Sequence, residues 1–180
     1  MSGPVRVAVA WAGEAPEVRL LDARSTSLDE AGLRAWARRV TDAAGAAHQS
    51  RSYRHPYCVI AWYAEPVGID IERIEALDND FLRSISTPSE LTEAAGHGSG
   101  NDRDASSRWC AKEALAKALG DAIAYDPRRL DSPARWPDGR SGPWCATDLV
   151  VEPQHVVWLC WRDTGSEQHR RQRDPAGHNR

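Results

Sequence analysis

The chain has 180 residues, of which 27% are charged and 41% hydrophobic, and its formal net charge at pH 7 is -3. This length fits one domain or two small lobes that share a core, and it excludes two ordinary independent domains. The negative net charge and the lack of an apolar run of about 20 residues argue against nucleic-acid and membrane partners. Because the first residues lack a signal-peptide pattern, we expect a cytoplasmic protein, with a monomer favoured over an oligomer.

The N-terminal third predicts a strand followed by a long helix. Residues 5–11 (VRVAVAW) are apolar and β-branched, as in a strand. Ser27 precedes Glu30 by three positions, which is a capping-box pattern and predicts a helix start. The apolar residues that follow recur at helical spacing: Leu33, Trp36 and Val40. This helix is expected to end at residues 43–45.

A polar link over residues 47–54 then leads to two apolar segments. Residues 57–63 (YCVIAWY) and 67–74 (VGIDIERI) both read as strands, with a turn at Glu65-Pro66 between them. Such closely spaced strands are expected to form an antiparallel pair.

The remaining chain predicts helices and a final hairpin. The expected elements are a short helix at 81–85, a helix opened by Thr87-Pro88, a loop at 95–107, a helix at 108–119, irregular structure at 126–143 and a hairpin of strands 148–151 and 155–161. We therefore predict an α+β fold of two pseudo-twofold-related lobes, each a small antiparallel sheet packed on a long helix. The expected division is an N-terminal lobe at 1–66, a C-terminal lobe at 67–164 and a disordered tail at 165–180.

The second apolar strand carries two carboxylates on one face. Side chains alternate along a strand, so Asp70 and Glu72 share a face while Ile69 and Ile71 point to the other. Adjacent carboxylates repel each other, and a divalent cation would compensate for this repulsion. Oxygen ligands with no neighbouring Cys or His favour Mg²⁺. The alternative is an edge strand whose polar face is only solvated.

The helix at 108–119 holds both lysines of the chain. Glu113 and Lys117 lie one helical turn apart, and Lys112 flanks them. A carboxylate and an ammonium on one face could hold a cation and a phosphate, although an exposed ion pair has the same spacing.

Together, Gly68-Ile69-Asp70-Ile71-Glu72 and the stretch from Trp109 to Lys117 (WCAKEALAK) resemble the 4'-phosphopantetheinyl transferase superfamily. The two motifs occur in the family's order and at its spacing, and Glu90 falls where the family has an acidic residue opening an intervening helix. The resemblance is firmest over residues 57–120 and extends to about residue 162.

This resemblance implies transfer of the phosphopantetheine group of coenzyme A to a serine of an acyl or peptidyl carrier protein, with Mg²⁺, releasing 3',5'-ADP. Mapped onto this chain, Asp70, Glu72 and Glu113 would hold the metal. Lys117 would contact the departing nucleotide's phosphate, Glu113 would accept the serine proton, and Lys112 would lie near the pyrophosphate. Such enzymes serve peptide and polyketide synthases in natural-product biosynthesis.

The N-terminal lobe departs from the family pattern. Where two-lobed members carry a Ser-His pair whose His reaches the 3'-phosphate of coenzyme A, this chain reads Ser52-Tyr53-Arg54-His55. Ser52, Arg54 and His55 are therefore the candidate contacts, and Arg51 is a further basic residue that could replace the missing charge. The upstream basic Gly-Lys-Pro-like segment is missing and the lobe is short. Two alternatives follow: a relative repurposed for a different reaction in a specialised pathway, or a non-catalytic carrier-binding partner.

Overall fold

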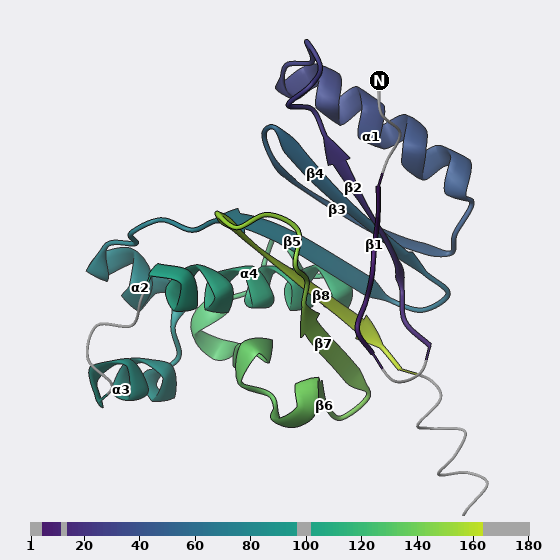
Figure 1. The fold of residues 1–180 in the computed structure, drawn as a ribbon. Helices are drawn as coiled ribbons and strands as arrows, with labels where there is room; N and C mark the ends of the chain where they lie inside the picture. Colours follow the sequence, from purple (N-terminus) through teal and green to yellow (C-terminus); the bar gives the residue numbers. More distant parts are fainter. Residues whose placement is uncertain (1–4, 12–13, 97–101, 164–180) are drawn as a thin grey trace, which may run out of the picture.

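In the computed structural model, which describes residues 5–11, 14–96 and 102–163, two antiparallel sheets lie face to face (Figure 1). One long helix covers the outer face of each sheet, and the largest apolar cluster fills the space between the sheets. The order of layers is therefore helix, sheet, sheet, helix. This arrangement confirms the α+β prediction of two lobes, each a small antiparallel sheet with a long helix.

Each sheet has four strands. The first sheet has the spatial order β1-β2-β4-β3, with β1 (Val5–Val7), β2 (Glu17–Asp22), β3 (His48–Arg54) and β4 (Tyr57–Tyr63). The second has the order β5-β8-β7-β6, with β5 (Val67–Arg73), β6 (Arg140–Ser141), β7 (Trp144–Asp148) and β8 (His155–Arg162).

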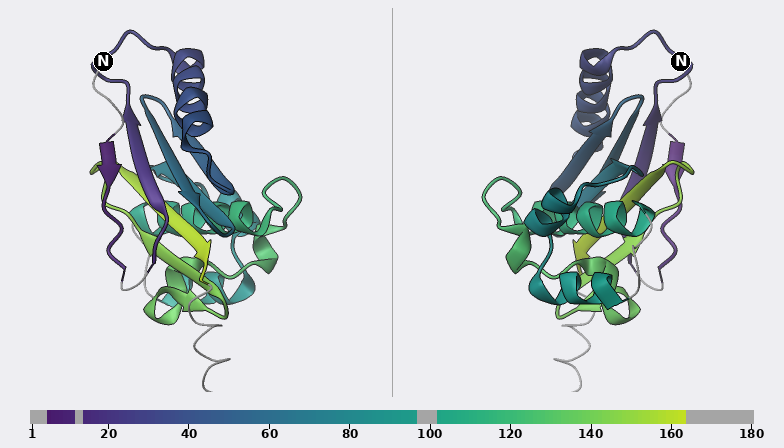
Figure 2. Two further views of the ribbon diagram at one scale, coloured as in Figure 1. Left: turned by 90° about the vertical axis from the view of Figure 1, so that its right-hand side faces the viewer. Right: turned by 90° about the vertical axis from the view of Figure 1, so that its left-hand side faces the viewer.

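The first long helix covers the first sheet, and the other helices gather around the second (Figure 2). The helices are α1 (Glu30–Ala44), α2 (Asn79–Ile85), α3 (Pro88–Gly96) and α4 (Asp102–Leu119). Three short 3-10 segments follow α4: η1 (Pro127–Arg129), η2 (Pro133–Arg135) and η3 (Pro137–Gly139). Within the described residues, no helix has the length and apolar character needed to cross a bilayer.

The apolar run of β4 is explained by burial of both of its faces. Val59 and Ala61 belong to the cluster between the sheets, whereas Cys58 and Ile60 pack under α1. A strand covered on both sides has no polar face, so it does not show the alternation of a half-exposed strand.

The expected antiparallel pairing of the two segments at 57–63 and 67–74 is wrong. β4 pairs with β2 and β3, and β5 pairs with β8, so the two segments belong to different sheets. The chain passes from one lobe to the other through residues 64–66. Sequence proximity favoured this hairpin, but β4 instead forms a hairpin with the preceding strand β3, and β5 pairs with the distant strand β8.

The polar stretch at 47–54 was also misjudged, because it forms strand β3 rather than a link. Its inward residues are Ser50 and Ser52, and both hydroxyl groups are used in hydrogen bonds across to β5. Because its inward residues are serines, β3 lacks the alternation of apolar and polar residues that would have indicated a strand in the sequence.

Several element boundaries differ from the sequence prediction. Helix α1 is capped by Asp29, whose side chain accepts a hydrogen bond from the Gly32 N–H, and not by Ser27. Of the loop expected at 95–107, residues 95–96 lie in α3 and 102–107 in α4, and the rest falls outside the described residues. The final hairpin exists, but its first strand is β7 rather than 148–151. The tail at 165–180 lies outside the described residues.

Candidate active site

Strand β5 presents its even-numbered residues to helix α4. A Cβ atom at Gly68 would lie 1.9 Å from the carbonyl oxygen of Ala114, so only glycine allows the strand and the helix to approach this closely. Ile69 and Ile71 point the other way, into the cluster between the sheets. Asp70 and Glu72 consequently share the face toward α4, as the alternation predicted.

Asp70 is the centre of the polar contacts between the lobes. Its side chain is buried, with the residue 3% exposed. Its Oδ1 atom accepts hydrogen bonds from Ser52 Oγ at 2.7 Å and from Lys117 Nζ at 2.6 Å. Lys117 Nζ also donates to the Ile69 carbonyl at 3.2 Å. The Oδ2 atom of Asp70 is buried without a hydrogen-bond partner, although buried carboxylate oxygens are normally satisfied.

The edge strands β3 and β5 run side by side in the same direction. Ser52 contacts Asp70, and two positions further along both strands Arg54 Nε donates to Glu72 Oε2 at 2.6 Å. Ser50 completes this series, since its Oγ accepts the Ile69 N–H at 3.0 Å. The first lobe thus fixes both carboxylates of the second lobe.

Helix α4 brings the third carboxylate to the same region. Glu113 Oε1 accepts a hydrogen bond from the hydroxyl group of Tyr125, which lies in the loop after the helix. One turn later, Lys117 forms an ion pair with Asp70. The sequence also allowed an exposed ion pair between Glu113 and Lys117 along the helix, but the structure pairs this lysine with Asp70 instead.

Burial and mutual repulsion change the acidity of two carboxyl groups. Burial, reinforced by the charge of Asp70, raises the pKa of Glu72 to about 7, while Arg54 and a hydrogen bond from Trp109 oppose this shift. Burial also raises the pKa of Glu113, against the hydrogen bond from Tyr125, and the charge of Asp70 adds to the increase. The three carboxylates therefore interact, and a cation would relieve the cost of their ionisation.

These residues fit Mg²⁺ in the chemistry of their donors. The unpartnered Asp70 Oδ2 atom offers a buried oxygen, and carboxylates are the ligands that Mg²⁺ prefers. Within the described residues, however, no three Cys, His, Asp or Glu side chains are arranged closely enough to hold a metal ion. Mg²⁺ is commonly bound by only one or two carboxylates and completes its shell with water or phosphate, so fewer than three of these groups would suffice.

A pocket of about 620 Å³ adjoins the carboxylates at Lys117. Its walls come from both lobes: α1, β3, the end of α4 and residues 120–124. The basic side chains that line it are Arg34, Arg38, Arg51 and Lys117. The guanidinium of Arg34 lies 4.6 Å from the ring centroid of Tyr53 and bonds to Glu30 at 2.6 Å, so its position is fixed. Among the described residues of the lining, four cations outnumber the one carboxylate, that of Asp121, and this balance favours an anionic ligand.

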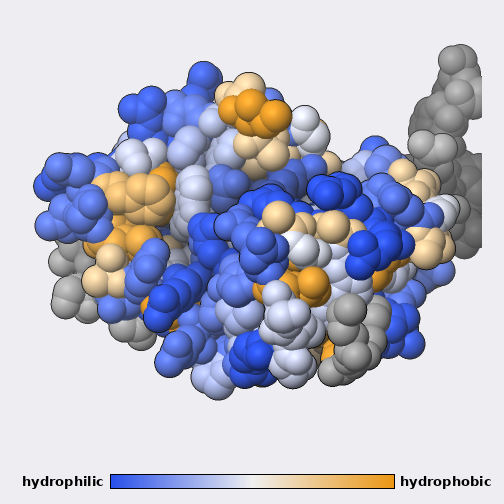
Figure 3. Space-filling model, turned by 90° about the horizontal axis from the view of Figure 1, so that it is seen from above, coloured by the Kyte–Doolittle hydropathy of each residue, from blue (hydrophilic) through white to orange (hydrophobic). Residues whose placement is uncertain are grey.

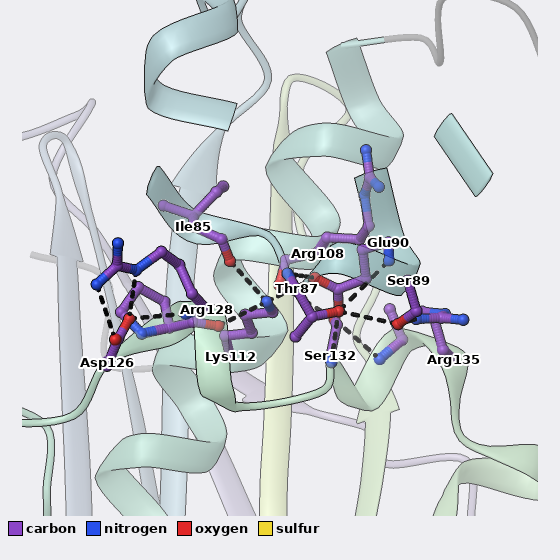
Figure 4. Close-up of polar contacts among 12 residues, drawn as sticks. Ile85, Thr87, Ser89, Glu90, Arg108, Lys112, Asp126, Arg128, Ser132 and Arg135 are labelled. Carbon is purple, nitrogen blue, oxygen red and sulfur yellow. Dashed lines mark hydrogen bonds and ion pairs between the residues drawn. The ribbon is translucent and has the colours of Figure 1, made fainter. Parts of the chain in front are cut away.

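Lys112 occupies a different place from the one expected. Its ammonium donates to the carbonyls of Ile85 at 2.6 Å and Pro127 at 2.9 Å and to Glu90 Oε2 at 2.6 Å (Figure 4). Lys112 and Glu90 are each 1% exposed. All three donors are used inside the protein, so the structure places this lysine in a buried ion pair and not with Asp70 or the pocket.

The remaining residues singled out from the sequence are distributed around the site. Arg54 pairs with Glu72, and His55 Nε2 contacts the Leu28 carbonyl at 3.1 Å in the turn between β3 and β4. Trp109 packs edge-on against Phe81 at a centroid distance of 5.5 Å.

Sequence reasoning missed Arg34, Arg38 and Tyr125. The spacing of the two arginines by one turn on the polar face of α1 is a usable signal, because such residues point in the same direction. No pattern in the sequence marks Tyr125.

The comparison with protein families agrees with this geometry. The family model described as 4'-phosphopantetheinyl transferase superfamily matches residues 66–169, which is more than half of the chain. The chain belongs to this superfamily, whose members are transferases that use coenzyme A and act on carrier proteins. The match begins directly before β5 and includes Asp70, Glu72, Glu113 and Lys117. No curated protein matches the chain.

Proposed function

We propose that this protein transfers the 4'-phosphopantetheine group of coenzyme A to a serine of an acyl or peptidyl carrier protein. The observation that carries this proposal is the ion pair of Lys117 with the buried Asp70 beside the basic pocket, with the second oxygen of Asp70 left unpartnered. Phosphoryl transfer depends mainly on positioning and charge stabilisation, which such a set of residues supplies.

In the proposed reaction, the serine oxygen of the carrier bonds to the phosphorus that bears the pantetheine arm. The bond from this phosphorus to the bridging oxygen breaks, and 3',5'-ADP leaves with that oxygen. The serine proton passes to Glu113, directly or through water. Lys117 stabilises the negative charge on the departing nucleotide.

Asp70, Glu72 and Glu113 would hold Mg²⁺, which when bound neutralises charge on the pyrophosphate. Arg54 would partly neutralise the charge of Glu72, and the hydrogen bond from Ser52 would hold the Asp70 side chain in place. His55 and Lys112 are not part of this proposal, because their contacts lie elsewhere.

We further infer that the basic pocket receives the nucleotide half of coenzyme A. Arg34, Arg38 and Arg51 supply charge where two-lobed relatives are expected to use other basic residues, and guanidinium groups suit phosphate recognition. The short first lobe is then compensated by arginines of α1 and β3.

The carrier protein is expected to dock by charge. Figure 3 shows that, from above, hydrophilic residues cover most of the described surface and apolar residues form small separate patches. Arg83 on α2 and Arg103 on α4 are exposed and would face an acidic carrier helix, for which Arg83 would exchange its exposed pair with Asp80. Replacing both with alanine is expected to weaken carrier binding about tenfold.

The test of this function is transfer itself. The protein is incubated with Mg²⁺, coenzyme A and apo carrier proteins, and the carrier mass is measured intact. We expect addition of one phosphopantetheine group, and none to a matched carrier whose acceptor serine is alanine.

Failure to modify any carrier, together with no calorimetric binding of coenzyme A, would overturn the proposal. Binding of coenzyme A without transfer would instead indicate a repurposed or non-catalytic protein. Cytoplasmic location and service to a natural-product pathway remain proposals that fit such an activity.

A further inference from the structure

The loop after α4 returns over the helix and contacts two adjacent helical residues. Pro127 supplies its carbonyl to Lys112 at 2.9 Å, and Tyr125 donates its hydroxyl to Glu113. Within the loop, the Tyr125 N–H bonds to the Asp121 carbonyl at 3.1 Å. The tyrosine is thus held by the chain on both sides of it.

The buried ion pair explains why this loop is fixed so firmly. Lys112 also donates to Glu90 and to the Ile85 carbonyl. Its ammonium therefore links α4 to α3, to the end of α2 and, through the Pro127 carbonyl, to the loop. Glu90 adds a link through the N–H of Ser132 at 2.9 Å. The position of Tyr125, two residues before Pro127, follows from this anchor.

We propose that Tyr125 is a positioning residue, whose hydroxyl group holds the Glu113 carboxylate in the orientation needed for the transfer reaction. Oε1 of Glu113 is taken by the phenol, which leaves Oε2 for the reacting groups. A Glu side chain has three rotatable bonds, and fixing one oxygen restricts all of them. This inference rests on the proposed function.

The matched variants are Tyr125→Phe and Tyr63→Phe, which each remove one hydroxyl group. Tyr63 is half-buried at the end of β4 and packs against the cluster between the sheets. We expect Tyr125→Phe to lower kcat on the order of tenfold, with the KM for coenzyme A changed by less than about twofold. Tyr63→Phe should transfer at the wild-type rate.

A spectroscopic readout tests the contact without transfer activity. A phenol that donates to a carboxylate absorbs differently from one that donates to an amide, so Glu113→Gln should shift the near-ultraviolet tyrosine band. The shift should be absent when Glu113→Gln is made in the Tyr125→Phe background, and this outcome would support the contact in solution.

The outcomes separate the two proposals. If the wild-type protein transfers and Tyr125→Phe keeps its kcat, or loses only affinity for coenzyme A, the positioning role is overturned while the function stands. If Glu113→Gln shifts the band equally in both backgrounds, the contact itself is refuted. If the wild-type protein transfers nothing, the proposed function fails, and the positioning role of Tyr125 in transfer fails with it whatever the spectrum shows.

Discussion

At the scale of single residues, Gly68 decides whether β5 and α4 can meet. A methyl group there would collide with the Ala114 carbonyl at 1.9 Å, and a backbone atom cannot move aside cheaply. We predict that Gly68→Ala lowers the free energy of unfolding by about 3 kcal/mol, the upper part of the overpacking range. Urea unfolding measures this change.

Gly142→Ala is the control for that substitution. Nothing lies within 4 Å of its Cβ position, but its φ is +58°, so it incurs only backbone strain of about 1 kcal/mol. If Gly68→Ala costs no more than Gly142→Ala, the close approach of strand and helix is not the reason for this glycine.

At the scale of elements, the buried pair of Glu90 and Lys112 joins α3 to α4. Burial alone would raise the pKa of Glu90, but hydrogen bonds from Lys112 and from the N–H groups of Thr87 and Ser132 outweigh it and lower the pKa below 4.5. The Glu90 carboxylate therefore binds a proton more readily in the unfolded chain than in the folded protein. The stabilising contribution is therefore complete above pH 4.5 and is lost as the pH falls through the lower pKa of the folded state.

We predict that Glu90→Gln lowers stability at pH 7 by about 3 kcal/mol, because it leaves a buried ammonium without its counterion. Its stability should also fall less steeply than that of the wild type as the pH drops below 4.5. Chemical denaturation over a pH series provides both values. Asp80→Asn, which removes an exposed pair with Arg83, should change stability by less than about 0.5 kcal/mol. Equal effects of the two substitutions would contradict the role of the buried pair.

Elements with a local signal were predictable from the sequence. The Thr87-Pro88-Ser89-Glu90 pattern opens α3 as expected, with the Thr87 N–H on Glu90 Oε2 at 2.9 Å, and Gly45 ends α1 in a left-handed conformation. Strand β3 was not predictable, because its inward serines satisfy partners on β5 that only the assembled lobes provide. For the same reason the sequence pointed to the face shared by Asp70 and Glu72 but not to the contacts of Lys112.

At the scale of the whole molecule, the basic pocket exists only because two lobes meet. Arg38 on α1 belongs to the first lobe and Lys117 on α4 to the second, and both line it. We predict that Arg38→Glu weakens coenzyme A binding about tenfold, and that raising the salt concentration reduces this difference, because the interaction is largely electrostatic. Calorimetry measures the Kd.

Arg39→Glu is the matched variant, since Arg39 is exposed on the same helix and is not among the residues that line the pocket. It should bind coenzyme A within about twofold of the wild type. Equal weakening by both substitutions would indicate a general charge effect and would remove the pocket from the nucleotide site.

The central claim is that Asp70, whose charge acts on Glu72 and Glu113, is needed for phosphopantetheine transfer, and Asp70→Asn tests it most directly. The amide keeps the size of the side chain but removes its charge. We therefore predict that the rate of transfer to an apo carrier, measured from the intact mass of the carrier in the presence of Mg²⁺ and coenzyme A, falls at least about 100-fold. Asp148→Asn, at the exposed end of β7, should transfer as the wild type does. Transfer by Asp70→Asn at the wild-type rate would contradict the account.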